Sequence, residues 1–229
     1  GTIPNCVSYD PTFGFEAVVI IQDGIRRMYE NNENVYYYVT VMNENYTQPE
    51  MPKGAEEGIR KGMYLLKQID ASKKSARVQL MGSGTILREV IAAAELLQKD
   101  FDIASDIWSA TSFTELGRDG MACERWNRMH PEAAPRLPHV ALCLEKRSGP
   151  VIAASDYMRA FPEQIRSNIS QKVVTLGTDG FGRSDTRANL REFFEVNRHH
   201  VVIASLKALA DEGTIDKKKV SEAIKKYGV

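Results

Sequence analysis

The stretch that decides the fold is Val78-Gln79-Leu80-Met81-Gly82-Ser83-Gly84-Thr85-Ile86. Its first four residues form a mostly apolar run typical of a buried strand, and the two glycines permit a sharp turn. From Ile86 to Lys99, apolar side chains recur at helical spacing, which places Val90, Ala93 and Leu97 on one face. A strand that turns directly into a helix is the building unit of a parallel sheet.

The same alternation continues along the rest of the chain. Apolar runs predict strands at 105–110, 150–155 and 173–177, and an edge strand at 63–69. Helices are expected at 115–129, 139–146, 157–168 and 188–194, followed by two more capped by Asn197 and Asp216. The sequence therefore predicts an α/β fold of three layers, in which helices cover both faces of a mostly parallel sheet of about five strands.

The first 52 residues follow a different pattern. Residues 14–29 have apolar side chains near helical spacing, with Asp10-Pro11 as the expected cap and first-turn proline. Residues 35–42 are β-branched and aromatic throughout, which predicts a strand buried on both faces. Residues 43–54 contain Pro49 and Pro52 and are typical of a linker, and 55–62 form a short helix or turn.

Composition excludes several classes of protein. The 229 residues are 43% hydrophobic and 26% charged, with 30 basic and 30 acidic side chains, as in an ordinary globular protein. A balanced charge gives no global field that attracts nucleic acid. No apolar run is long enough to span a membrane, and no signal peptide is evident. Three widely spaced cysteines, without zinc-ligand spacing, indicate reduced thiols in a cytoplasmic protein.

The turn Gly82-Ser83-Gly84 could begin a phosphate-binding loop. A dinucleotide motif would need a glycine at position 87, which is Leu87, and a P-loop would need Gly-Lys-Ser/Thr. We therefore favour a tight strand-to-helix turn, and an anion at the following helix N-terminus stays open.

A second glycine-rich loop follows the strand at 173–177. It leaves the carboxyl end of that strand, where ligands bind in open α/β sheets. Two interpretations stay open, namely an ordered turn whose charges pair internally and a functional loop. The candidate residues are Gly177, Asp179, Gly180, Phe181, Gly182, Arg183, Ser184 and Asp185.

No complete catalytic set is visible in the sequence. Glu115 and His130 could form an acid–base pair, but a solvated helix face is the better interpretation. Cys123 and Cys143 are expected to be core thiols. The adjacent pair His199-His200 points in directions about 100° apart on a helix, so the two rings cannot chelate one ion.

Longer stretches carry a resemblance. Five stretches resemble the homodimeric type of pyruvate dehydrogenase. They are residues 36–46 and 51–62, Thr111 to Gly120, Cys123 to Asn127 and Leu176 to Asp185. This family is the thiamine-diphosphate-dependent, decarboxylating first component of the bacterial pyruvate dehydrogenase complex. The Phe181-Gly182-Arg183-Ser184 core also resembles the C-terminal domain of the transketolase superfamily. The resemblance runs from Thr2 to Val229, as in a piece of a longer protein.

The resemblance implies a division into two parts. Residues 1–52 are expected to be a helix–strand remnant of the middle, pyrimidine-binding domain with a linker, and 53–229 a transketolase-like C-terminal domain. The family's Gly-Asp-Gly metal–diphosphate motif and its activating glutamate are absent here. We therefore expect no catalytic, cofactor-binding or metal-binding residue in this segment. Thiamine diphosphate and Mg²⁺ belong to the intact protein, and the segment alone is expected to bind neither and to be inactive.

The resemblance also implies partners. The intact enzyme decarboxylates pyruvate and reductively acetylates a lipoyl group on the dihydrolipoyl acetyltransferase component. It is a cytoplasmic homodimer that uses no nucleic acid and no membrane. We assign loop 177–185 to the dimer or partner interface, and expect residues 1–42 to pack against the C-terminal domain or to pair with a second copy. The alternative is a non-catalytic α/β interaction module.

Overall fold

A computed structural model describes residues 3–73 and 75–229. Gly1, Thr2, at which the resemblance begins, and Lys74 lie outside the described residues. Among the described residues, no helix combines the length and the apolar character needed to cross a membrane.

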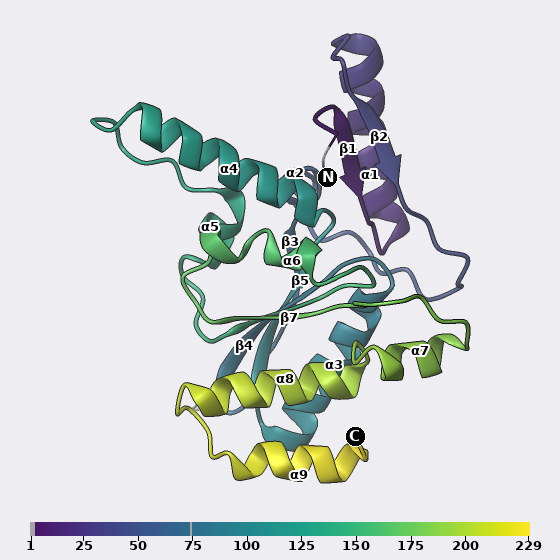
Figure 1. Cartoon of the computed structure of the whole chain (residues 1–229), viewed down its shortest axis with the longest axis vertical. Helices are drawn as coiled ribbons and strands as arrows, with labels where there is room; N and C mark the ends of the chain where they lie inside the picture. Colours follow the sequence, from purple (N-terminus) through teal and green to yellow (C-terminus); the bar gives the residue numbers. More distant parts are fainter. Residues whose placement is uncertain (1–2, 74) are drawn as a thin grey trace.

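The core of the molecule is a five-stranded sheet of order β3-β5-β4-β6-β7 (Figure 1). Its parallel strands are β4 (Arg77–Gly82), β5 (Ala104–Ser109), β6 (Val151–Ala154) and β7 (Val173–Leu176). Strand β3 (Tyr64–Ile69) runs antiparallel to β5 at one edge. The predicted mostly parallel sheet with an antiparallel edge strand is confirmed.

Helices cover both faces of this sheet, as predicted (Figure 1). One side carries α3 (Ile86–Phe101), α8 (Arg198–Asp211) and α9 (Lys218–Tyr227), and the other carries α4 (Phe113–Met129), α5 (His139–Leu144) and α6 (Ala160–Glu163). Successive residues of a strand pack against opposite helix layers. On β4, Leu80 packs with the layer of α3, α8 and α9, and Met81 packs with the layer of α4, α5 and α6. The cap prediction for α8 is also confirmed, since the Asn197 side chain accepts hydrogen bonds from the amides of His199 and His200.

The helix predicted over 157–168 was wrong in extent. Only α6 and a 3₁₀ turn (Arg166–Asn168) form there. Pro162 has no amide hydrogen to bond the carbonyl of Met158. The carbonyl of Tyr157 instead accepts a 2.9 Å hydrogen bond from the amide of Thr178, beyond β7. A contact with a distant loop therefore replaces the first turn of the predicted helix.

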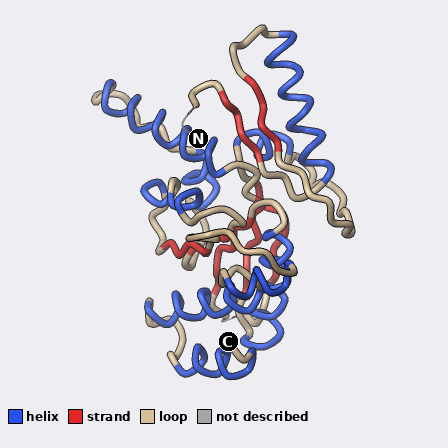
Figure 2. The backbone as a smooth tube through the Cα atoms, turned by 45° about the vertical axis from the view of Figure 1, so that its right-hand side comes forward, coloured by secondary structure: helices blue, strands red, loops and turns tan. Residues whose placement is uncertain are grey.

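An N-terminal unit stands apart from the main sheet (Figure 2). In it, β1 (Cys6–Tyr9) and β2 (Tyr36–Val39) form a two-stranded parallel sheet. Helix α1 (Gly14–Ile25) packs on this sheet and continues as a π-helical turn, Arg26–Glu30. Strand β1 did not emerge from the sequence pattern. The polar linker then leads to α2 (Glu56–Lys61).

The prediction of a strand at 35–42 buried on both faces was wrong. The strand covers only Tyr36–Val39, and Tyr38 is 60% exposed while Val41 is 83% exposed. Strand β2 pairs with β1 alone, and only alternate residues such as Tyr37 pack inward. A run of β-branched and aromatic residues therefore does not by itself reveal whether a second layer covers it.

The cap predicted for the first helix was also wrong. The helix begins at Gly14, and the capping residue is Phe13 rather than Asp10. The side chain of Glu16 turns back instead, and its Oε2 accepts hydrogen bonds from the amides of Thr12 at 2.5 Å and Phe13 at 2.9 Å. Two otherwise unpaired amides at the helix start are thereby satisfied.

The same Glu16 side chain connects the N-terminal unit to the main sheet through hydrogen bonds. Its Oε1 accepts hydrogen bonds of 2.6 Å from the hydroxyls of Tyr64 on β3 and Ser109 on β5. Glu16 is fully buried, so all of its partners are protein groups that water does not reach. Residues 3–42 thus pack against the α/β layers, which is the first of the two alternatives expected for them.

We expect Glu16→Ala to lower the free energy of unfolding by about 3–5 kcal/mol, because two amides and two hydroxyls in the interior lose their hydrogen-bond acceptor. Urea denaturation measures the loss. The control is Glu57→Ala, because the Glu57 side chain is 70% exposed and its surface ion pair with Lys61 contributes little to stability. Equal losses in the two variants would contradict the role given to Glu16.

Candidate functional site

The carboxyl ends of the parallel strands form the edge where a ligand site is expected. The chain passes from β4 to β5 on one side and then to β6 and β7 on the other, so the order of the sheet reverses between β4 and β6. Open α/β sheets bind ligands at such a crevice. The turns after these two strands touch, since the hydroxyl oxygens of Ser83 and Ser155 lie 3.2 Å apart.

The turn Gly82-Ser83-Gly84 is a tight connection whose amides donate to backbone carbonyl groups, Ser83 to Ala154 and Gly84 to Asp10. A Cβ on Gly82 would lie 2.7 Å from the Cα of Leu87, which explains the glycine. Gly84 has φ +48°, and a Cβ there would lie 2.6 Å from either carboxyl oxygen of Asp10. The Gly84 amide donates to the Asp10 carbonyl at 3.0 Å. The structure thus agrees with the tight-turn interpretation.

The second glycine-rich loop leaves β7 and leads into α7 (Arg187–Phe193). Its residues 179–185, Ser184 included, are all exposed. The Asp179 carboxyl pairs with the guanidinium of Arg159 and accepts the Arg159 amide at 3.0 Å. Asp185 accepts the amide of Thr186 at 2.6 Å. The two acids therefore bond to neighbouring segments and not to the arginine of their own loop.

Two other residues of this loop have no such anchoring. The Arg183 guanidinium lies over the Phe193 ring, 4.6 Å from its centre, and makes no ion pair among the described residues. Phe181 is 94% exposed and is flanked by Gly180, with φ +92°, and Gly182. The interpretation of an ordered turn whose charges pair internally therefore holds for Asp179 and Asp185. The side chains of Phe181 and Arg183 face solvent instead.

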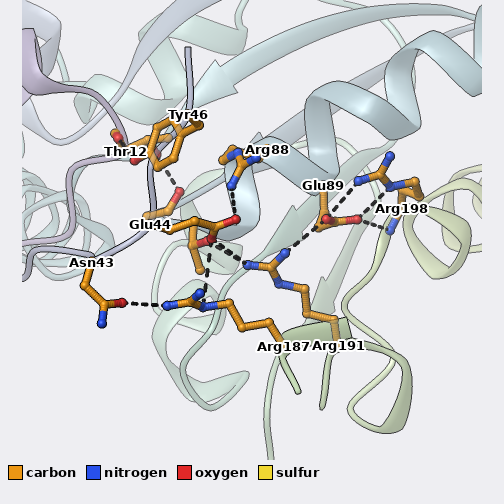
Figure 3. Close-up of polar contacts among 11 residues, drawn as sticks. Thr12, Asn43, Glu44, Tyr46, Arg88, Glu89, Arg187, Arg191 and Arg198 are labelled. Carbon is orange, nitrogen blue, oxygen red and sulfur yellow. Dashed lines mark hydrogen bonds and ion pairs between the residues drawn. The ribbon is translucent and has the colours of Figure 1, made fainter. Parts of the chain in front are cut away.

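Behind the loop lies an ionic cluster that the sequence patterns missed (Figure 3). We call it the Glu44–Glu89 network. It joins a glutamate of the linker and one of α3 to four arginines from α3, α7 and α8, namely Arg88, Arg187, Arg191 and Arg198. The only signal in the sequence was an unusual number of arginines between positions 183 and 198.

The geometry of this network explains which groups are ionised. Glu44 Oε1 lies 2.5 Å from Arg88 Nη1, and this hydrogen bond holds the pKa of Glu44 below its ordinary value. Glu44 Oε2 is buried without a hydrogen-bond partner in the described chain, 3.7 Å from Arg191 Nη2. Burial opposes ionisation of Glu89, but hydrogen bonds from Arg198, 2.9 Å away at the closest, outweigh it and lower its pKa.

A cavity of about 250 Å³ lies between the network and the loop. It is lined by the side chains of three arginines together with Thr85, Asp156 and the loop backbone, the arginines being Arg183, Arg187 and Arg191. Arg191 already donates to the Thr85 hydroxyl at 2.8 Å and is 14% exposed. Arg187 and Arg191 also pair with Glu44, so this part of the lining joins the linker to α7 and, through Thr85, to the start of α3.

The acid–base pair considered for Glu115 and His130 does not form. Glu115 pairs with Arg118 at 2.7 Å near the start of α4. His130 caps the far end of α4, about 22 Å away at 1.5 Å per residue, and stacks on Trp126. His199 stacks on Tyr227 at 4.5 Å, whereas His200 bonds to the Asn197 side chain, so this pair serves packing and capping.

Cys123 and Cys143 are half-buried and not the core thiols expected from the sequence. Burial raises the pKa of Cys143 to about 11, although a nitrogen of His139 lies 3.5 Å from its sulfur. Burial and the neighbouring Asp119 also raise the pKa of Cys123. In the described ranges, no group of three or more His, Cys, Asp or Glu side chains is placed to hold a metal ion.

Comparison with known proteins places two family models on the chain. Residues 62–197 match the transketolase-like C-terminal domain, and residues 1–49 match the middle domain of the pyruvate dehydrogenase E1 component. A pyruvate dehydrogenase E1 component from Cupriavidus necator is 60% identical over 99% of this chain and 25% of the relative. The one from Pseudomonas aeruginosa is 59% identical over 100% of this chain and 26% of the relative.

The chain thus spans about a quarter of the length of the curated relatives it matches. Among solved structures, transketolase from Campylobacter jejuni superposes with a TM-score of 0.57 at 18% identity, over 90% of this chain and 26% of that one. Transketolase from Leishmania mexicana gives 0.58 at 16% identity, over 91% and 26%. At these identities the likeness supports the fold alone.

We expect Glu89→Gln to lower the free energy of unfolding by about 2 kcal/mol at pH 7, because Arg191 and Arg198 lose a charged acceptor. The folded-state pKa of Glu89 lies below its ordinary value of 4.5, so the unfolded chain binds more protons. The stability from Glu89 is therefore present above about pH 5 and is lost as the pH falls through the folded-state pKa.

Urea titrations at several pH values measure this effect. The difference between the parent chain and Glu89→Gln should shrink as the pH falls below 4.5, the ordinary pKa. Glu222→Gln, on the exposed face of α9, serves as the control and should leave the pH profile unchanged. A difference that does not vary with pH would show that Glu89 acts through shape and not through charge.

Proposed function

The chain belongs to the family of transketolase-like C-terminal domains, and on this premise we propose that it is the C-terminal part of a pyruvate dehydrogenase E1 component. One observation carries the proposal, the 60% identity to an E1 component over 99% of the chain. The match of residues 1–49 to the E1 middle domain supports it, because transketolase-like C-terminal domains alone would not specify what precedes them.

We propose a boundary near residue 52. Residues 1–52 are then the end of the middle domain with its linker, and 53–229 form the C-terminal domain. The separate two-stranded sheet of β1 and β2 supports this division. Glu16 and the Glu44–Glu89 network hold the two parts together across the proposed boundary.

The intact protein would decarboxylate pyruvate and transfer the acetyl group to a lipoyl group on the dihydrolipoyl acetyltransferase component. Thiamine diphosphate and Mg²⁺ would supply the carbanion chemistry of this reaction. The described residues do not fit that cofactor, since they offer no cluster of metal-ligating side chains. We propose that the cofactor site lies in the rest of the protein, that the protein is cytoplasmic, and that this segment serves packing and association.

Loop 177–185 is proposed as the contact with a second copy of the protein. Phe181 is 94% exposed at the tip, and glycines on both sides let the ring project. Aromatic and arginine side chains are the residues that most often anchor protein interfaces. Arg183 lies over the Phe193 ring but makes no ion pair within the described part of the chain, whereas the acids of the loop are paired.

A chimera tests the proposed function. The last quarter of the Cupriavidus necator E1 component is replaced by this chain, and acetyl transfer from pyruvate is measured with the lipoyl partner. We expect activity within about tenfold of the parent, a change of about 1.4 kcal/mol in the barrier. The isolated chain is the control and should show no activity and no saturable binding of thiamine diphosphate with Mg²⁺. A folded but inactive chimera would contradict the proposal.

Phe181→Ser tests the interface in the same chimera. We expect the dimer dissociation constant to rise about 30-fold, a loss of about 2 kcal/mol, because the ring would leave a desolvated pocket of the second copy. Analytical ultracentrifugation measures the change. Ile224→Ser, on α9 and 42% exposed, is the matched control. An unchanged dissociation constant for Phe181→Ser would remove the loop from the interface.

A further inference from the structure

A second cavity lies between the N-terminal unit and the main sheet, apart from the loop and the network described above. Its volume is about 190 Å³. Its walls come from β1, β2, the turn after β4, the start of α4 and the segment after β6. It therefore lies at the carboxyl ends of β4 and β6, at the reversal of strand order where α/β sheets bind ligands.

The walls of this cavity combine aromatic rings with a single carboxyl group. The rings include Tyr38, Phe113, Tyr157 and Phe161, and the carboxyl group belongs to Asp10. Tyr157 and Phe161 lie with ring centres 5.4 Å apart. The lining contains hydroxyl groups but no lysine or arginine. Tyr38 is 60% exposed and Tyr157 38%, so the aromatic side of the cavity is open to solvent.

The carboxyl group of Asp10 has no cationic partner among the described residues. It accepts a hydrogen bond from the Thr40 hydroxyl and lies against Gly84. Burial raises its pKa and, with the nearby Asp156 and Glu16, outweighs the lowering by hydrogen bonds from the Thr40 and Ser83 side chains. By contrast, the buried carboxyl group of Glu16 receives four hydrogen bonds, and Glu89 has two arginines. A carboxylate held out of water without a cation is costly.

We propose that this cavity binds a small organic ammonium ion, with its charged nitrogen at Asp10 and its apolar part against Tyr38, Tyr157 and Phe161. Aromatic faces attract an ammonium group through the ring quadrupole, and a carboxylate adds direct charge pairing. The volume of the cavity equals that of roughly six water molecules, at about 30 Å³ for each molecule. That space suits an amine with one ring or a few carbons.

Calorimetry with the 229-residue chain tests the proposal. Phenethylammonium is the probe, and 2-phenylethanol is its neutral counterpart with the same ring. We expect saturable binding of the amine with a dissociation constant of about 1 mM. The alcohol should bind at least about tenfold more weakly, because it lacks the charge. Equal binding of both compounds, or no saturation by the amine at about ten times that concentration, would overturn the proposal.

Three variants locate the bound amine. Asp10→Asn keeps the shape and removes the charge, and should weaken amine binding at least about tenfold. Its control is Asp70→Asn, since Asp70 is 81% exposed and lies near the opposite end of β4. Tyr157→Leu keeps the carboxyl group and removes a ring, and should weaken binding about 3–30-fold. Thermal unfolding confirms that each variant is folded.

Unchanged amine affinity in a folded Asp10→Asn variant would overturn the assignment of the charged nitrogen. Unchanged affinity in Tyr157→Leu would overturn the aromatic part of the site. If Asp10→Asn does not fold, Tyr157→Leu and the alcohol still decide the question. None of these measurements depends on the activity of the intact enzyme, so failure here and failure of the proposed function are distinguishable.

Discussion

The buried carboxyl group of Glu16 is the interaction on which the arrangement of this chain depends. Four donors converge on it, two from the start of α1 and one each from β3 and β5. Because none of them reaches water, the N-terminal unit has only one orientation in which all are satisfied. A buried polar group of this kind specifies geometry more sharply than apolar contact, which tolerates sliding.

Several other contacts follow from that orientation. Once α1 is fixed, Thr12 lies over the glycine turn and its hydroxyl donates to the Gly84 carbonyl at 2.6 Å. The amide of Asp10 donates to the Thr111 carbonyl at 2.8 Å, beyond β5. The N-terminal segment thereby covers the carboxyl ends of the parallel strands. Its Asp10 carbonyl accepts the hydrogen bond of the Gly84 amide after β4, and the smaller cavity lies beside Asp10.

The Glu44–Glu89 network stabilises the same arrangement from the other side. Its arginines come from three helices and converge on two glutamates, so the linker cannot leave the α/β layers without separating charges. Partly exposed ion pairs contribute little singly, but a network of several charges around a nearly buried Glu89 is stronger.

The sequence by itself determined the alternation of strands and helices, the antiparallel edge strand and the Asn197 cap of α8. Each rests on residues within a few positions of one another. It also pointed to the loop at 177–185 through its glycines. The prediction that Asp216 caps the last helix was wrong by one residue, because Lys217 precedes α9.

Only the tertiary structure decided the exposure of residues 35–42, the interruption after Tyr157, and the partners of Asp10, Glu16 and Glu44. These depend on contacts between residues 21 to more than 100 positions apart, such as Tyr157 with Thr178 and Glu44 with Arg191. Local periodicity has no means of encoding such contacts, because it reports which face of an element is apolar and not what packs against it.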